Sequence, residues 1–169
     1  ACKVFSKNDL EFSVNITDHD LMDKNFPTFL ESCCKKYNIL KNKVSLEILE
    51  EASISKNIQA QKNLKKLKTL GFLLSIDDFG VEYSNFSQLK YLDIDSVKID
   101  GSFIKDIDTN KNSQYITESI LSYTKHIKVK TVAEFVHSEE VFNQINKLGV
   151  DYAQGYYFGK PQKDLITND

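Results

Sequence analysis

Several features that mark common protein classes are scarce in this sequence of 169 residues. The three cysteines (Cys2, Cys33 and Cys34) are odd in number and lack the CxxC spacing of a zinc site, so neither a disulfide framework nor a zinc knuckle is expected. No stretch reaches the roughly 18 consecutive apolar residues of a membrane span, and the N-terminus has no signal-peptide pattern. We therefore predict a cytoplasmic segment without membrane contact, whose parent protein could still be membrane-anchored.

An excess of charge of either sign is also missing. The 22 basic and 24 acidic residues give a net charge of -2, so no broad electrostatic attraction to duplex nucleic acid is expected. The sequence shows no linker, repeat or low-complexity tract, and 41% of its residues are apolar, which is enough for a sizeable core. Residues 1–169 are therefore interpreted as a single domain.

Short runs rich in Val, Ile and Phe alternate with segments of helical period, which is typical of βα units with a parallel sheet in an α/β fold. Several runs are apolar almost throughout, as expected of strands that are buried on both faces. We predict strands near residues 10–15, 43–48, 71–76, 95–99, 128–133 and 150–153.

Polar side chains recur where these strands end. Asp77 and Asp78 follow an apolar run, and two adjacent carboxylates there are costly unless a cation lies between them. In a parallel barrel, the residues at the carboxyl ends of successive strands meet at one face, where barrel enzymes keep their active sites. The other strand-end residues of this kind are Asn15, Glu47, Lys98, Glu134 and Gln154.

These residues lie in six motifs that occur in order along the chain: VNI, LEILE, IDDFG, VKID, VAEF and AQGYYFGKP. Together the motifs resemble those of EAL-domain proteins, the bacterial phosphodiesterases of the second messenger cyclic di-GMP. The resemblance implies a TIM-like (β/α)8 barrel with one antiparallel strand. It also implies hydrolysis of cyclic di-GMP to linear 5'-pGpG with two Mg²⁺ or Mn²⁺ ions, which prefer oxygen ligands.

The resemblance also implies a role for each residue. Asn15, Glu47 and Asp77 would bind the first ion, while Asp77 and Asp78 would hold the second. Lys98 would orient the attacking water, and Glu134 would bind the second ion and help to hold that water. Gln154 would hydrogen-bond the water or the substrate, and Glu50 would tie down the loop after the DDFG strand.

Each of these residues also has an ordinary structural explanation. Asn15 could cap a turn, Glu47 could be a surface residue, and Lys98 could form a structural salt bridge with Asp77 or Asp78. Glu134 could be a strand-end carboxylate and Gln154 a turn residue. The aromatic cluster Tyr152, Tyr156, Tyr157 and Phe158 is expected to be core, with stacking on guanine as the alternative.

The Glu-Ala-Leu signature of the family, whose glutamate completes the first metal site, is not in these residues. We therefore expect an incomplete barrel that lacks its first strands and comprises the C-terminal two thirds, and we expect these residues alone to be inactive. Sensory or GGDEF domains are expected upstream in the parent protein. The resemblance also leaves room for a homodimer.

Two motifs depart from the family pattern. In DDFGVEYSN, Val81 and Glu82 replace small residues, and glutamate adopts the positive φ angles that glycine allows only at a cost. In AEFVH, Phe135 replaces a glycine and His137 a glutamate, and an imidazole there could still meet a water or a metal. The alternative to an enzyme is a degenerate EAL domain that binds cyclic di-GMP or regulates a neighbouring domain without catalysis, and a barrel that only mediates protein contacts is a third hypothesis.

Overall fold

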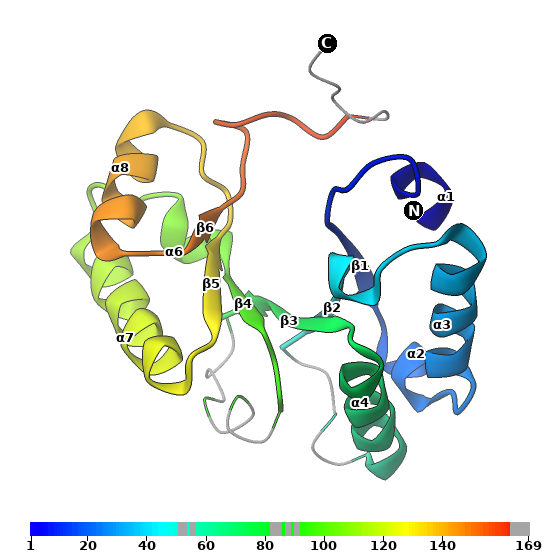
Figure 1. Ribbon diagram of the computed structural model, residues 1–169. Coiled ribbons are helices and arrows are strands. Elements are labelled where there is room, and N and C mark those ends of the chain that lie inside the picture. The colour runs from blue at the N-terminus through cyan, green and yellow to red at the C-terminus, as the bar shows by residue number, and fades with distance from the viewer. Residues whose placement is uncertain (51–53, 55–56, 82–85, 87–88, 90–91, 163–169) are drawn as a thin grey trace. The chain divides into compact units, whose positions relative to one another are not determined.

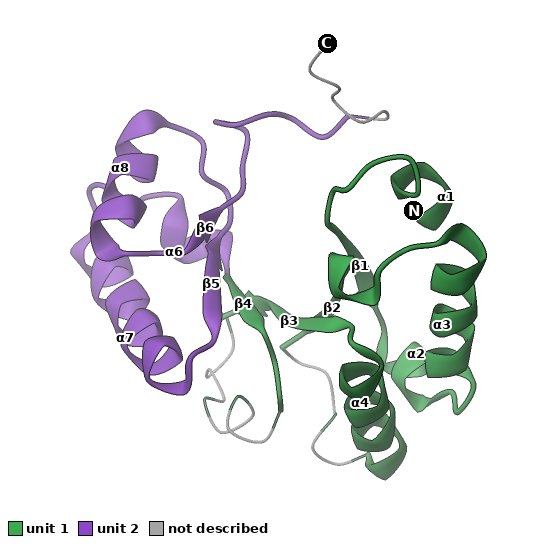
Figure 2. Cartoon of the chain, in the orientation of Figure 1, with its two compact units in different colours: residues 1–98 green, residues 99–169 purple. Residues whose placement is uncertain are grey.

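The computed structural model describes residues 1–50, 54, 57–81, 86, 89 and 92–162 (Figure 1). The chain forms two compact units, residues 1–98 and residues 99–169 (Figure 2). Each unit is described by itself below. Along the whole chain, the strands are hydrogen-bonded in sequence order, β1-β2-β3-β4-β5-β6. The strand β4 (Ser96–Ile99) contains the boundary between the two units.

Unit 1 alternates strands with helices, as the sequence predicts. The strands β1, β2 and β3 are parallel, and Asn15 lies opposite Glu47 while Glu47 lies opposite Ser75. Figure 1 shows α2, α3 and α4 together on one side of these strands. The elements are α1 (Cys2–Phe5), β1 (Phe12–Ile16), α2 (Asp18–Met22), α3 (Phe26–Tyr37), the 3-10 helix η1 (Lys41–Lys43), β2 (Val44–Leu49), α4 (Ile58–Leu70) and β3 (Leu73–Phe79).

The two faces of this sheet differ in polarity. Alternate strand residues form a buried apolar face, which includes Ile16, Leu46, Ile48, Leu74, Ile76 and Val97. The opposite face carries Ser13, Asn15, Ser45, Glu47, Ser75, Asp77, Ser96 and Lys98. Burial on both faces, as the sequence suggests for several strands, is seen in β3 and β4, where Ser75 and Lys98 of the polar face are buried. Because side chains alternate along a strand, the polar face brings its hydrophilic residues together, and Ser96 donates a hydrogen bond to Ser75 (Oγ–Oγ 2.9 Å).

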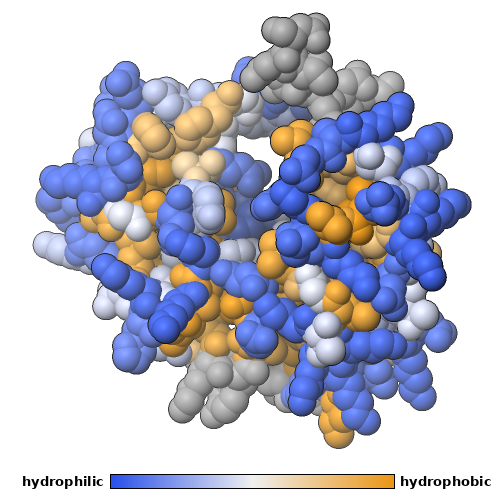
Figure 3. All heavy atoms as spheres, in the orientation of Figure 1, coloured by the Kyte–Doolittle hydropathy of each residue, from blue (hydrophilic) through white to orange (hydrophobic). Residues whose placement is uncertain are grey.

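The start and end of helix α4, which precedes β3, are determined by local capping residues. The Asn57 side chain accepts a hydrogen bond from the Ala60 amide (3.0 Å), which caps the helix start. Gly71 ends the helix at φ 95°, a conformation that glycine adopts at little cost. Leu64 and Leu67 are buried, and Figure 3 shows mostly hydrophilic side chains over this helix.

Unit 2 continues the pattern with α6 (Gly101–Ile104), α7 (Lys111–Ile127), β5 (Lys130–Ala133), α8 (Glu139–Leu148) and β6 (Tyr152–Ala153). The strands β5 and β6 are parallel, with Ala133 opposite Ala153. Asn110 and Ser138 cap the starts of α7 and α8 through their side chains, and Gly149 ends α8 at φ 85°. Within the described ranges, no helix is both long and apolar enough to cross a lipid bilayer.

Candidate active site

Lys98 is the centre of the charged group on the polar face of unit 1. Its ammonium lies 2.7 Å from Asp77 Oδ1 and 3.3 Å from Glu47 Oε2, and only 7% of the residue is exposed. The three residues come from β4, β3 and β2. The salt bridge that the sequence offers as an alternative for Lys98 is therefore present, and it shows that Glu47 and Asp77 reach a common cation.

Asn15 lies beside this group. It is the register partner of Glu47 in the parallel pair of β1 and β2, so both side chains leave the same face of the sheet. Asn15 is exposed, whereas Glu47 is half-buried. An amide oxygen and a carboxylate are thus neighbours at the carboxyl end of these two strands.

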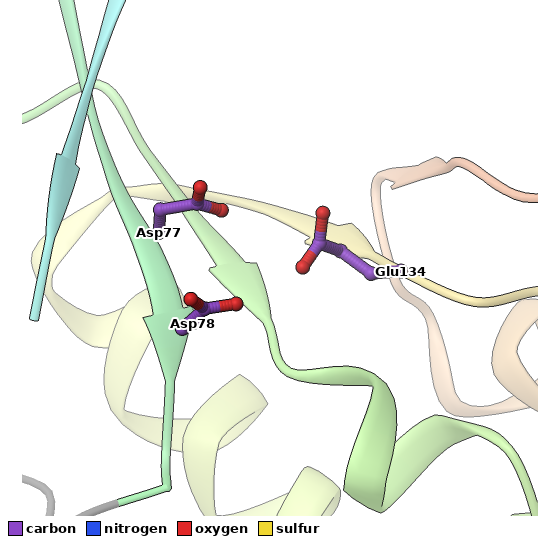
Figure 4. Close-up of side chains that lie close together, drawn as sticks. All are labelled: Asp77, Asp78 and Glu134. Atoms are coloured by element: carbon purple, nitrogen blue, oxygen red, sulfur yellow. The ribbon is translucent and has the colours of Figure 1, made fainter. Parts of the chain in front are cut away.

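Asp78 breaks the alternation of β3. Successive strand residues normally point to opposite faces, but Asp78 has φ 53°, in the left-handed region that Asp adopts more readily than most residues. Figure 4 shows the Asp77 and Asp78 carboxylates on the same side of β3. The positive φ therefore allows two consecutive carboxylates to serve one site.

Glu50 holds the chain directly after these carboxylates. It is 8% exposed, its Oε2 accepts a hydrogen bond from the Gly80 amide (2.9 Å), and its own amide donates to the Asp77 carbonyl (3.2 Å). Gly80 has φ 113°, which suits glycine alone. Val81 is 56% exposed, and Glu82 lies outside the described residues.

The charges of this group do not cancel. Glu47, Asp77 and Asp78 bring three negative charges and Lys98 brings one positive charge, which leaves two negative charges. Carboxylates held together in a partly buried place repel one another unless a cation compensates. Hard oxygen donors with this net charge fit a divalent ion such as Mg²⁺ or Mn²⁺.

In unit 2, Glu134 and Gln154 follow β5 and β6. Glu134, whose side chain is labelled in Figure 4, is half-buried, and its amide donates a hydrogen bond to the Ile99 carbonyl (3.3 Å). The Gln154 amide donates to the Ala133 carbonyl (2.8 Å), and its carbonyl accepts from the Val136 amide (3.1 Å). Backbone hydrogen bonds therefore fix both strand ends, while the Gln154 residue is exposed.

The two substituted residues of AEFVH adopt a tight turn. Phe135 has φ 56° and is 68% exposed, so a bulky residue takes up a conformation that favours glycine. The exposed His137 ring lies with Nδ1 3.2 Å from the Phe135 carbonyl, which accepts the hydrogen bond when Nδ1 is protonated. This contact is local and points the rest of the ring to solvent.

The aromatic residues near the end of the chain are more exposed than expected. Tyr152, Tyr156, Tyr157 and Phe158 are between 43% and 64% exposed, so the prediction that they form core is wrong. Tyr157 and Phe158 still pack on Phe142 of α8, with ring centroids 5.7 and 5.4 Å from it. This contact pins the chain after β6 to the helix.

A cavity of about 560 Å³ in unit 2 lies away from these strand ends. It is lined by residues at the amino end of β5, where Lys130 forms a salt bridge with Asp151 (2.6 Å). The hydrogen bond and charge of Asp151 raise the pKa of Lys130. Because barrel active sites lie at the carboxyl ends of strands, the carboxylate group and not this cavity is the candidate active site.

The family follows from a comparison with known proteins. The family model described as "EAL domain" matches residues 2–161. The chain belongs to this family. Its fold is therefore the α/β fold of EAL barrels, of which the described residues form part, as the resemblance implies.

Individual relatives agree with this assignment. The chain is 41% identical over 151 residues to the Escherichia coli K12 protein named "Probable cyclic di-GMP phosphodiesterase PdeA", covering 89% of this chain and 21% of the relative. It is 37% identical to "Cyclic di-GMP phosphodiesterase PdeA" of Borreliella burgdorferi, covering 93% of this chain and 24% of the relative. The chain thus spans less than a quarter of either protein.

A solved structure gives the same result. The Klebsiella pneumoniae BlrP1 structure titled as a manganese and cy-diGMP complex superposes with a TM-score of 0.88 at 25% identity. The superposition covers 95% of this chain and 42% of that chain. The EAL-type fold is thus shared over nearly all of these residues.

The serines that precede the charged residues by two positions, on the same face of the sheet, were not predicted from the sequence. Ser75 is 2% exposed and bonds to Ser96, two residues before Asp77 and Lys98 respectively. Reading the strands with a period of two, as Ser13 and Asn15 or Ser45 and Glu47, would have revealed it. These small hydroxyl side chains extend the polar face of the sheet next to the carboxylates.

Proposed function

We propose that this chain is the catalytic part of a metal-dependent phosphodiesterase that hydrolyses cyclic di-GMP to linear 5'-pGpG. One observation carries the proposal: Glu47 and Asp77, from different strands, both lie within salt-bridge distance of the Lys98 ammonium. Two oxygen donors that reach one ammonium group support a divalent-cation site at the same place. Two relatives carry the name of this activity, and a related structure is titled with manganese and the nucleotide.

The oxygen donors supply a metal site. Asn15, Glu47 and Asp77 would hold one ion, and Asp77, Asp78 and Glu134 a second. The ions, when bound, offset the negative charge of the phosphodiester and lower the pKa of a bound water. Asp78 contributes to this set because of its unusual backbone conformation.

The side chains of the protein then position the reactants. Lys98 donates a hydrogen bond that orients the attacking water, and its positive charge offsets the charge that develops on the phosphate. Glu134 accepts a hydrogen bond from this water and holds it in line with the phosphorus. The side-chain amide of Gln154 hydrogen-bonds the water or the substrate. Because the product carries a 5' phosphate, water forms a bond to phosphorus and the bond from phosphorus to the 3' oxygen breaks.

Glu50 acts through the loop and not on the substrate. Its hydrogen bonds to Gly80 and to the Asp77 carbonyl hold the backbone on both sides of Asp78. Since Asp78 has a positive φ, the conformation depends on its surroundings. Glu50 thus keeps the two consecutive carboxylates directed at one site.

The test is hydrolysis of cyclic di-GMP by the full-length protein with Mn²⁺ or Mg²⁺, followed by chromatography of the product. Asp77→Asn should lower kcat/KM by more than about 100-fold, since it removes a metal ligand and weakens the neighbouring charges. Asp93→Asn, an exposed aspartate of the same unit, is the matched control and should leave the rate unchanged. Equal rates in wild type and Asp77→Asn would contradict the metal assignment.

A binding module without catalysis is the second candidate. The observation that favours it is the turn directly after Glu134, where Phe135 replaces the glycine and His137 the glutamate of the family motif. Calorimetry separates the two functions. Saturable binding of cyclic di-GMP with no product in the presence of either metal supports the module and rejects the enzyme.

A further inference from the structure

Phe135 combines two unfavourable properties. Its backbone lies at φ 56°, a conformation that bulky residues rarely adopt, and 68% of the residue is exposed, so little burial offsets the strain. A glycine would adopt this φ without cost. A phenylalanine at such a position indicates that the ring itself has a use.

Backbone hydrogen bonds hold the residues on both sides of Phe135. On one side, the Glu134 amide donates to the Ile99 carbonyl (3.3 Å). On the other, the Val136 amide donates to the Gln154 carbonyl (3.1 Å) and the Val136 carbonyl accepts from the Tyr157 amide (3.0 Å). Hydrogen bonds on both flanks therefore hold the strained residue in place.

The ring is seated on a glycine. A Cβ atom added to Gly101 would lie 2.3 Å from Phe135 Cδ2 and 2.6 Å from Cγ, so only glycine leaves room for the ring. Gly101 is the first residue of α6, three positions after Lys98. One side of the ring thus packs against Gly101, just after β4, and the rest of its surface is open to solvent.

We propose that Phe135 is a stacking platform for a guanine base of the dinucleotide substrate and so a specificity-determining residue of the site. The inference rests on the proposed function, because it takes the substrate from there. An exposed, immobilised aromatic ring directly after Glu134 is suited to the π-face of a base. Stacking also explains why a strained aromatic residue stands where glycine would be relaxed.

The first experiment compares substitutions at this position in the full-length protein, with KM and kcat for cyclic di-GMP measured separately. Phe135→Tyr keeps the ring and should behave as wild type. Phe135→Leu and Phe135→Gly should raise KM by about tenfold, in keeping with the contribution of a stacked base, while kcat changes much less. Wild-type KM in Phe135→Leu would overturn the platform.

A double-substitution cycle tests the seat of the ring. Gly101→Ala should displace the ring and raise KM about as much as Phe135→Leu does. In a Phe135→Gly background the added methyl group meets no ring, so Gly101→Ala should have no further effect on KM. Equal effects of Gly101→Ala in both backgrounds would show that the ring is not involved.

A spectroscopic signal reports stacking without turnover. These 169 residues contain no tryptophan, and the fluorescence of Phe135→Trp should be quenched by cyclic di-GMP. Tyr123→Trp is the control, because Tyr123 lies near the end of α7. This end of the helix leads into the start of β5, whereas Phe135 follows the end of that strand. No quenching of Phe135→Trp, or equal quenching of both, would contradict the proposal.

These measurements also separate this inference from the proposed function. If the protein binds cyclic di-GMP without hydrolysing it, dissociation constants from calorimetry replace KM and the same comparison of variants applies. Binding that is unaffected by Phe135→Leu overturns the platform alone. No binding by the wild-type protein overturns both proposals.

Discussion

The two units place different kinds of residue at their strand ends. In unit 1 side-chain pairing organises the site: Lys98 bridges Glu47 and Asp77, and Glu50 is 8% exposed and bonded to Gly80, while Asn15 and Asp78 at its edge are exposed. In unit 2 the strand-end residues Phe135, His137 and Gln154 are exposed, and backbone hydrogen bonds hold their positions. Charge is therefore organised by side chains in unit 1, whereas unit 2 presents side chains to solvent from a fixed backbone.

This difference indicates which residues tolerate substitution. The charged group of unit 1 keeps every residue that the resemblance names there, although the loop after it departs from the family pattern at Val81 and Glu82, whereas unit 2 departs at Phe135 and His137. Removing a member of a buried charge network leaves its partners unpaired, which is costly. An exposed residue on a fixed turn, such as Phe135 or His137, can change with little effect on folding, so such positions can vary while the charged group cannot.

The largest effect on stability is expected for Lys98→Met. This variant leaves Glu47 and Asp77 without their common cation and should lower the free energy of unfolding by about 3–5 kcal/mol. Mn²⁺ should restore more stability to this variant than to wild type, because the ion replaces the lost charge. Thermal unfolding with and without Mn²⁺ measures both effects, with Lys62→Met, an exposed lysine of α4, as control. Wild-type stability in Lys98→Met without metal would contradict the network.

A smaller effect is expected for Glu50→Ala. The variant leaves the Gly80 amide without its acceptor and should cost about 2 kcal/mol, as for other hydrogen bonds to charged groups. Glu50→Gln keeps an acceptor oxygen and should lose less. Urea unfolding gives these differences, and equal stability of the alanine and glutamine variants would show that the Gly80 contact contributes nothing.

Asp20 gives a pH-dependent effect in the same unit. Its carboxylate accepts from the Thr17 hydroxyl (2.6 Å) and amide (2.9 Å), and these hydrogen bonds lower its pKa below 3.8. Because the folded pKa is lowered, this stabilisation is present above pH 3.8 and is lost as the pH falls through the folded pKa. At neutral pH, Asp20→Asn should be less stable than wild type by about 1 kcal/mol or less. Urea unfolding across the acid range should show the gap closing, and a gap that stays constant would rule out this assignment.

The smallest effect is expected in unit 2. His137 is exposed, and its ring lies against the nearby Phe135 carbonyl. His137→Ala should therefore change the free energy of unfolding by less than about 0.5 kcal/mol. A loss as large as that of Glu50→Ala would show that the turn of unit 2 is as tightly organised by side chains as unit 1, and the contrast between the units would fail.

Much of this arrangement was predictable from the sequence because it depends on local patterns. The predicted boundaries lie within about two residues of the observed ones, the usual error of such boundaries, except that β3 ends at Phe79, three residues beyond its predicted end. Gly71 and Gly149 end their helices in the left-handed conformation, as expected of glycines after a helical stripe. The resemblance also directed attention to Glu47, Asp77 and Lys98, which the structure brings together.

Other features were not predictable because they depend on backbone conformation or on tertiary packing. No sequence pattern shows that Asp78 and Phe135 have positive φ, since neither residue requires it. The exposure of Tyr156 depends on what the rest of the fold covers. The pairing of Lys98 with Asp77 was one of two alternatives, and only the distance of 2.7 Å between Nζ and Oδ1 distinguishes them.

Binding of Mn²⁺ to the full-length protein tests the central claim most directly, with free Mn²⁺ followed by electron paramagnetic resonance. The account predicts saturable binding that Glu47→Gln weakens at least about tenfold, because a carboxylate ligand is replaced by a neutral amide. Glu118→Gln, an exposed glutamate of α7, should bind Mn²⁺ as wild type does. Identical Mn²⁺ binding by wild type and Glu47→Gln would contradict the claim that the strand-end carboxylates of unit 1 form a divalent-cation site.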